Sequence, residues 1–473
     1  MRSIRSRFHF ALLACLLAAP GAAVGDPTEM VGRIFRTALA EGRAYELLGE
    51  LCRRYPHRLS GSPESNEANR WIKGEMERRG LATRLQQVTV PYWERGSTME
   101  VELDSGGETW TLTALALGGS VGTPPEGLTA RVVEVDSLDE VEALGEKGVG
   151  GRIVFFNRPL DAGSVSHFEA YIGAADQRVA GPSQAARFGA VGVLVRSLSF
   201  RDDDFPHTGG LRYEEGVPMI PAAALSVRAA ETLAARLAKD PEATVTVRMD
   251  CRQRDDRPSH NVIGEVTGNV LPEEYITIGA HFDAWDVGEG AHDNGAGSVQ
   301  AIEAVRLLRE LGYEFRRSVR VVMFANEEYL VGEPFRGGRV YAEEAVARGE
   351  THYAAIETDA GAFTPRGFGV EAPPETVARV RSWLEHFDNR QTIHYVDAGG
   401  GGPDIWALNE LLGTPAFDLR TDTQRYLDFH HSDNDTFDRI SRRELELGTA
   451  ALASLLYLID SRGLTDDEAS VAR

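Results

Sequence analysis

The sequence has 473 residues, of which 42% are hydrophobic, so the chain is long enough to bury the cores of two or three domains. Charged residues make up 26%, an ordinary share for a globular protein. The formal net charge of −22 argues against nucleic acid and anionic membrane surfaces as partners.

The first 25 residues have the pattern of a secretory signal peptide. Three arginines precede an apolar stretch from Phe8 to Pro20, and small residues follow at 23–25. This stretch is too short to span a bilayer, so we expect a secreted or periplasmic protein that begins at Asp26 and has no membrane span. A lipoprotein anchor at Cys15 is the minor alternative.

Two cysteines lie outside this leader, Cys52 and Cys251. In an exported protein they can form a disulfide, and they can equally stay unpaired. The sequence has no CxxC pair, which excludes a thiolate zinc site.

The predicted elements along the chain indicate an α/β protein. Residues 30–85 have apolar positions at helical spacing, and alternation with a period of two begins near Leu85. Short strand-like runs follow: ARVVEV, GRIVFFN and AVGVLVRS. Beyond residue 261, strands alternate with helices: strands at 275–279, 318–324, 353–356 and 416–419, and helices at 297–311 and 441–459.

This order predicts a mixed, largely parallel central sheet that is flanked by helices. The block at 110–252 has few ionisable residues of the kinds that bind metals, and it interrupts the pattern. We therefore predict one catalytic domain in two parts, 26–109 and 253–466, with the 110–252 segment as an insertion.

Acidic residues and histidines follow the predicted strands of the second part. In chain order they are His281, Asp283, Asp293, Glu327, Glu328, Glu357, Asp359, His430 and His431. Because sites in such sheets form at the carboxyl ends of the strands, we expect these side chains to meet at one edge. So many carboxylates would repel one another without a cation. A set of imidazoles and carboxylates without thiolates suits zinc and, less well, manganese or cobalt.

The number of candidate ligands is compatible with two metal ions. One carboxylate that bridges two ions lets five ligands serve both. Glu327 and Glu328 are adjacent, and neighbouring side chains in extended backbone point in opposite directions. One of them can therefore bind a metal ion while the other acts as a general base.

Four motifs, HFDAWDVGEGAHDNGAG, FANEEY, TDAGAF and FHHSDNDT, resemble in order and spacing those of the M28 family of zinc metallopeptidases. RLSGS at 58–62, PHTGG at 206–210 and GVPMIPAAALSV at 216–227 resemble one subgroup, so the resemblance covers nearly the whole mature chain. It implies the zinc exopeptidase fold with the insertion as a protease-associated domain. This domain would shape or cover the cleft and help to form a homodimer.

The resemblance also implies two zinc ions per chain, held by five ligands with Asp293 bridging: His281, Asp293, Glu328, Asp359 and His431. It makes Glu327 the general base and Asp283 the hydrogen-bond partner of the His281 imidazole. The family often has Asp-Asp at the bridge, whereas this chain has Asp293-Asn294. Because asparagine also forms hydrogen bonds, we expect the geometry to be retained.

The subgroup resemblance implies small peptide substrates, chiefly dipeptides with free ends, and hence a dipeptidase or carboxypeptidase. An aminopeptidase of the same family is the alternative. Asp404 would bind a free substrate amine or cap the helix that follows it. His430 would contact substrate or the oxyanion, and Tyr426 and Arg420 are further candidates for substrate binding.

Relatives with this fold also include metal-free binding proteins and a glutaminyl cyclase with one zinc ion. The presence of all five ligand positions favours the hydrolase over both.

Overall fold

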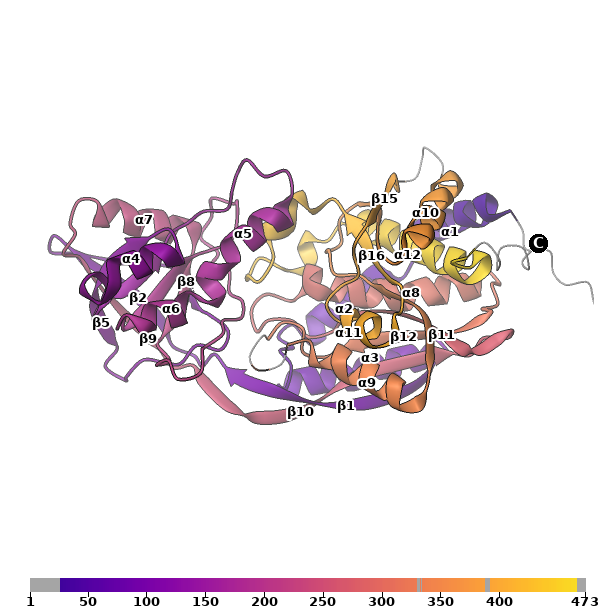
Figure 1. Cartoon of the computed structure of the whole chain (residues 1–473), viewed down its shortest axis with the longest axis horizontal. Helices are drawn as coiled ribbons and strands as arrows, with labels where there is room; N and C mark the ends of the chain where they lie inside the picture. The colour runs from indigo at the N-terminus through magenta and orange to yellow at the C-terminus, as the bar shows by residue number, and fades with distance from the viewer. Residues whose placement is uncertain (1–25, 330–331, 333, 388–391, 466–473) are drawn as a thin grey trace, which may run out of the picture.

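Two eight-stranded sheets organise residues 26–329, 332, 334–387 and 392–465, the part of the chain that this computed structural model describes. The sheets belong to two lobes that lie side by side (Figure 1). The expected leader at 1–25, with Cys15, lies outside the described residues. None of the described helices is both long and apolar enough to cross a membrane.

The first lobe contains the predicted central sheet. Its strands are, in spatial order, β1 (Ala82–Glu94), β10 (Arg252–Val266), β12 (Arg317–Phe324), β11 (Leu271–His281), β13 (Thr351–Glu357), β16 (Ala416–Thr421), β14 (Pro365–Glu371) and β15 (Tyr395–Ala398). Four of the pairings between these strands are parallel and three are antiparallel. The expected mixed α/β architecture is confirmed.

Helices cover both faces of this sheet. The helices α1 (Pro27–Glu41), α2 (Ala44–Arg54), α3 (Pro63–Arg78), α8 (Ala296–Glu310) and α12 (Arg442–Arg462) share one core with the sheet. The helices α9 (Arg336–Arg348) and α11 (Trp406–Leu412) share another core with it. In β12, Val321 belongs to the first core and Val322 to the second, as alternation along a strand requires. Every residue of β12 is buried, because helices pack on both sides.

The second lobe contains the other sheet. Its strands are, in spatial order, β3 (Glu108–Thr111), β2 (Met99–Ser105), β9 (Thr244–Met249), β5 (Leu128–Val135), β6 (Ile153–Phe156), β7 (Gly192–Arg196), β8 (Ala222–Leu225) and β4 (Ala114–Ala116). Its helices are α4 (Leu138–Val149), α5 (His167–Val179), α6 (Gly181–Arg187) and α7 (Val227–Leu237). The expected insertion begins at residue 110, but β2 and β3 begin earlier and already pair within this sheet. That this lobe is a protease-associated domain stays a prediction.

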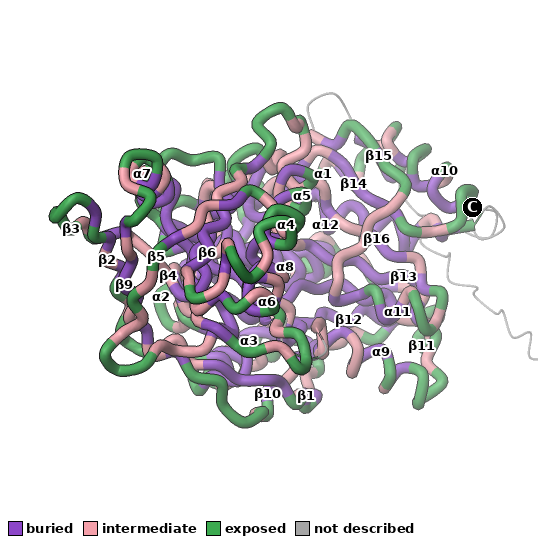
Figure 2. The backbone as a smooth tube through the Cα atoms, turned by 60° about the vertical axis from the view of Figure 1, so that its left-hand side comes forward, coloured by how far each residue is buried: buried purple, intermediate pink, exposed green. Residues whose placement is uncertain are grey.

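The two lobes are joined by chain and by packing. The paired strands β1 and β10 run along the base of the first lobe toward the second (Figure 1). Leu160 and Ala174 of the second lobe share a buried cluster with Phe363 and Tyr426 of the first. Figure 2 shows buried backbone through the interior, with exposed stretches at peripheral turns and helices such as α4.

Cys52 and Cys251 are buried and unpaired. They belong to different core clusters, so the alternative without a disulfide holds. Burial raises the pKa of each thiol to about 12, and neither is therefore a reactive thiolate at neutral pH.

Candidate metal centre

Strand ends deliver the acidic and histidine side chains to one place. β11 ends at His281, β12 ends three residues before Glu327, and β13 ends two residues before Asp359. β11 pairs in parallel with both β12 and β13, so the three carboxyl ends share an edge of the sheet. Asp293 enters from the turn before α8, and His431 enters from the loop before α12.

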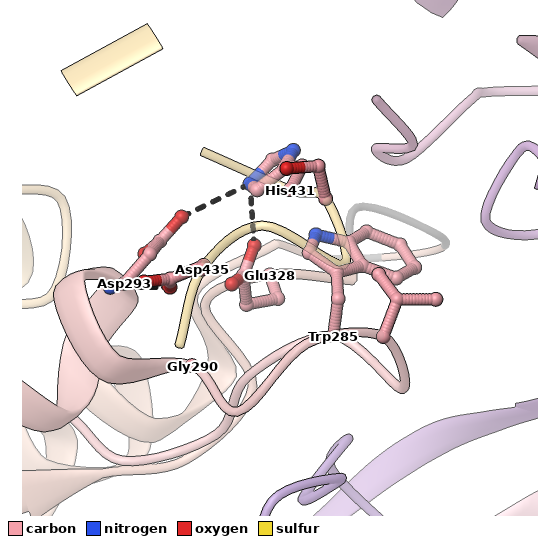
Figure 3. A pocket seen from close by; sticks show the side chains of 8 residues that line it. Trp285, Gly290, Asp293, Glu328, His431 and Asp435 are labelled. Carbon is pink, nitrogen blue, oxygen red and sulfur yellow. Dashed lines mark hydrogen bonds and ion pairs between the residues drawn. The ribbon is translucent and has the colours of Figure 1, made fainter. Parts of the chain in front are cut away.

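Asp293 lies between two histidines. Its Oδ1 atom is 3.3 Å from Nε2 of His281, and its Oδ2 atom is 3.3 Å from Nε2 of His431. Nε2 of His281 is also 3.5 Å from Oδ1 of Asp359. Nε2 of His431 is 2.9 Å from Oε2 of Glu328 (Figure 3). The structure thus brings all five expected ligands together in two groups that share Asp293.

Several buried polar atoms of this cluster are available to bind a metal ion. Nε2 of His281, Oδ2 of Asp293, Oε1 of Glu328 and Oδ1 of Asp359 are buried and have no hydrogen-bond partner among the described residues. Buried polar atoms normally have a partner, and their desolvation is costly without one. The ligand atoms of His281, Asp293 and Asp359 all lie within 4.8 Å of one another. Cations would satisfy these atoms and offset the repulsion between the carboxylates.

A short irregular turn, η1 (Ala291–Gly295), positions Asp293. The carboxylate of Asp435 accepts the backbone N–H groups of His292 and Asp293, at 2.7 and 3.0 Å. The peptide bond between Asp293 and Asn294 is cis. The Asn294 amide accepts the N–H of Gly297 at 3.0 Å and donates to the carbonyl of Thr358 at 2.9 Å. An ionised aspartate could not make the second bond, so asparagine fits this position.

Arg58, from the RLSGS motif, holds the loop between His281 and Asp293. Its side chain is fully buried. The guanidinium donates to the carbonyls of Phe282, Glu289 and Gly290, at 2.8, 2.8 and 2.7 Å. This fork fixes both ends of the glycine-rich loop, and therefore the spacing between two expected ligands.

The contact of Asp283 differs from the expected one. Nδ1 of His281 lies 3.0 Å from the backbone carbonyl of Asp283 and 3.9 Å from its carboxylate. The carboxylate instead accepts the N–H of Glu327 at 3.3 Å. The imidazole is therefore oriented through the backbone, which residue identity alone does not reveal.

Glu327 and Glu328 occupy different environments. The Glu328 side chain is 2% exposed and contacts His431, whereas the Glu327 side chain is 17% exposed, with Oε2 4.0 Å from Nε2 of His281. Burial raises the pKa of Glu327 well above its ordinary value; His281 opposes this, and Asp359 adds to it. Burial, followed by Asp293, raises the pKa of Glu328 to about 7. Glu327 is the more accessible of the two.

His430 and Tyr426, two of the expected substrate residues, lie beside the ligand cluster. The ring of His430 stacks on that of His431 at 3.5 Å between centroids, and its Nε2 is 3.6 Å from Oδ2 of Asp293. The ring centroid of Tyr426 lies 5.2 Å from that of His430. Burial raises the pKa of Tyr426 well above its ordinary value, and Asp293 adds to the shift, so its hydroxyl stays protonated.

Asp404 and Arg420 are the other two residues that we expected to bind substrate, and their surroundings differ. Asp404 is fully buried, and neither carboxylate oxygen has a hydrogen-bond partner among the described residues. Burial, followed by Glu357, raises its pKa well above the ordinary value. α11 begins after Ile405 and has no side-chain cap, which contradicts the capping alternative for Asp404. Arg420 contacts the carboxylate of Asp418 at 3.1 Å.

The structure adds residues that the sequence did not single out. A small pocket beside the cluster is lined by Trp285, Val287, Gly290, Asp293, Glu328, His431, Ser432 and Asp435 (Figure 3).

The second lobe also contacts the ligand cluster. Nδ1 of His431 lies 3.3 Å from the backbone carbonyl of Thr208. Thr208 belongs to the PHTGG motif, which the sequence had marked without giving it a role.

This fold and site define a hydrolase that depends on metal ions. The model of peptidase family M28 matches residues 261–456. The chain is 31% identical to carboxypeptidase Q of Bos taurus over 441 residues, which is 92% of this chain and 89% of that one. It is 23% identical over 287 residues to aminopeptidase YwaD of Bacillus subtilis, which is 60% of this chain and 54% of that one.

Among solved structures, the M28 peptidase precursor of Shewanella amazonensis superimposes with a TM-score of 0.86 at 31% identity, over 92% of this chain and 96% of that one. A zinc aminopeptidase from Bacillus subtilis has a similar fold, with a TM-score of 0.62 at 18% identity, over 89% of this chain and 95% of that one. The chain belongs to peptidase family M28 and is a metallopeptidase.

Proposed function

We propose that this protein is an exopeptidase with two zinc ions that hydrolyses small peptides, chiefly dipeptides with free termini. The observation that carries the proposal is the position of Asp293, whose two carboxylate oxygens face His281 and His431 separately. His281, Asp293 and Asp359 would hold one zinc ion, and Asp293, Glu328 and His431 the other. When bound, zinc supplies a Lewis acid that acidifies water and polarises the peptide carbonyl.

Glu327 would be the general base. It accepts a proton from the attacking water while the water oxygen bonds to the peptide carbon, and it returns the proton to the amine as the carbon–nitrogen bond breaks. Its exposure supports this role, since Glu328 beside it is closed in by His431. Tyr426 and His430 would contact the substrate or the developing oxyanion.

The preference for dipeptides rests on similarity to carboxypeptidase Q over most of both chains. Asp404, whose carboxylate has no hydrogen-bond partner within the residues that the structure describes, would be close to the site of the substrate amine. We also propose that the second lobe, which includes β2 and β3 in addition to the expected insertion at 110–252, is a protease-associated domain. The remaining parts of 26–109 and 253–466 would form the catalytic domain. The leader pattern at 1–25 supports export.

A blocked-substrate series tests the specificity. A free dipeptide, its N-acetyl form and its C-terminal amide are compared by kcat/KM on the zinc-loaded enzyme, with the Glu327→Gln variant as background. We expect the free dipeptide to be cleaved fastest, with losses from blocking either end. Retained activity on the amide together with loss on the N-acetyl form would instead indicate an aminopeptidase.

Metal analysis separates the enzyme from other proteins of this fold. We expect two zinc ions per chain. One ion would indicate a site of the glutaminyl cyclase kind, and none would indicate a binding protein without catalysis.

A further inference from the structure

We infer that the second lobe completes the metal centre, with Arg178 and the PHTGG segment at 206–210 positioning His431 for zinc. This inference rests on the proposed two-zinc site and assigns it a positioning residue from outside the catalytic domain. We call residues 206–210 the strap.

The strap and the histidine loop are joined by three hydrogen bonds. Nδ1 of His431 donates to the carbonyl of Thr208 at 3.3 Å, and the Thr208 N–H donates to the carbonyl of His431 at 2.9 Å. Nδ1 of His207 donates to the carbonyl of His430 at 2.7 Å. Because a carbonyl accepts only, Nδ1 of His431 carries a proton in this contact. In the neutral imidazole, Nε2 is then the unprotonated nitrogen, and it faces Asp293 and Glu328.

This contact therefore selects the tautomer that ligation through Nε2 requires. It also supports an uncommon backbone conformation. His431 has a φ of +60°, in the left-handed region that residues other than glycine seldom adopt. The bond from Thr208 to the His431 carbonyl holds this conformation, which directs the imidazole at Asp293.

The second lobe fixes the strap in turn. The hydroxyl of Thr208 donates to the carbonyl of Ala116 in β4 at 2.9 Å. The N–H of Gly118 donates to the carbonyl of Gly209 at 3.0 Å, and the N–H of His207 donates to the hydroxyl of Ser197 at 2.8 Å. The position of the Thr208 carbonyl is thus set by the lobe rather than by the histidine loop.

Arg178 of α5 makes the decisive contact with the strap. Its side chain is buried, and its guanidinium donates to the Thr208 carbonyl at 3.0 Å and to the hydroxyl of Tyr171. Among the described residues it has no carboxylate partner. Gly209 lies against it with a φ of +143°, and a Cβ there would be 2.4 Å from the guanidinium carbon. A buried charge without a counterion is costly, so its retention points to a role at the carbonyl it holds.

Thr208 therefore offers its carbonyl to two donors, Arg178 from its own lobe and His431 from the other. Loss of the guanidinium would free the carbonyl to turn, and His431 would lose its fixed tautomer and direction. Partners of this kind behind a ligating histidine typically contribute 10–100-fold to metal affinity.

Zinc titration of folded protein, in competition with a chromogenic chelator, tests this inference. Arg178→Gln is compared with the wild type and with Arg187→Gln, a control whose side chain is exposed on the same lobe and pairs with Glu214. We expect two sites in the wild type and the control. In Arg178→Gln one site should keep its affinity and the other should bind zinc 10–100-fold more weakly, with partial recovery in Arg178→Lys. Equal affinities in all variants would overturn the inference.

A wild-type protein that does not bind two zinc ions would instead refute the proposed function, so the two failures are distinct. A second measurement needs no variant. Because coupling between sites is reciprocal, zinc should slow amide hydrogen exchange in the strap, whereas α7 of the same lobe should not change. Equal exchange in the strap with and without zinc would also overturn the inference, even if Arg178→Gln did not fold.

Discussion

Nε2 of His431 lies 2.9 Å from Oε2 of Glu328. This contact connects the loop before α12 to the segment that follows β12. It also separates two adjacent glutamates. Glu328 is engaged and enclosed, while Glu327 is left with an accessible carboxylate. Identical side chains can therefore have different functions because the backbone directs them to different neighbours.

Glu327→Gln tests whether Glu327 is the general base while Glu328 binds metal. The change removes a proton acceptor and keeps the shape, so we expect turnover of a dipeptide to fall by about 10²–10⁴-fold with zinc content and thermal stability unchanged. Glu328→Gln is the matched control and should lose zinc. Near-normal turnover in Glu327→Gln would remove the assignment of the general base.

Asp293→Ala should affect both metal sites at once. One carboxylate faces both histidines, so its removal would take a ligand from each of the two proposed zinc ions. We expect zinc per chain, measured after dialysis, to fall from two to below one. Asp359→Ala, which removes a ligand from only one group, should retain about one zinc ion. Retention of a full zinc ion in Asp293→Ala would argue against a bridge.

Arg58→Met should destabilise the fold. It leaves the buried carbonyls of Phe282 and Gly290 and the half-buried carbonyl of Glu289 without this donor. At ~1–2 kcal/mol for each unsatisfied group, we expect the free energy of unfolding to fall by about 3–6 kcal/mol in urea titrations. Arg54→Met, a control on the exposed face of α2, should change it by less than ~1 kcal/mol. A similarly small change for Arg58→Met would show that these three hydrogen bonds do not stabilise the loop between His281 and Asp293.

The stability conferred by Glu350 should depend on pH. Burial opposes its ionisation, but His352 and Arg320 outweigh burial and lower its pKa to about 2. Arg320 donates to both Glu350 oxygens, at 2.6 and 3.0 Å.

A depressed carboxyl pKa stabilises the fold above the unfolded-state value of about 4.3, and this contribution is lost as the pH falls toward 2. Because solvent partly screens this ion pair, we expect Glu350→Gln to lower the free energy of unfolding by only about 1–3 kcal/mol at pH 7. The difference from the wild type in urea unfolding should shrink between pH 6 and pH 3. A constant difference would refute the lowered pKa.

The sequence predicted the mixed sheet and the convergence of its strand ends, because both follow from patterns with a fixed period. His281 and Asp359 could be placed together once β11 and β13 were expected to run in parallel. Contacts made by backbone atoms could not be predicted in this way. The partner of the His281 imidazole is the carbonyl of Asp283, and that of His431 is the carbonyl of Thr208.

Such contacts depend on how loops pack, and any residue type offers the same carbonyl. Asp404 illustrates a related difficulty. A carboxylate before a helix suggests a cap, but packing beside Glu357 leaves it buried, with no hydrogen-bond partner in the described part of the chain. Only the tertiary arrangement distinguishes these environments.

Anomalous diffraction at the zinc absorption edge, on crystals of the zinc-loaded enzyme, would show whether Asp293 bridges two zinc ions. We expect two peaks ~3.5–4 Å apart, one beside His281 and Asp359 and the other beside Glu328 and His431, with Asp293 between them. A single peak, or two peaks that do not share Asp293, would contradict this bridge.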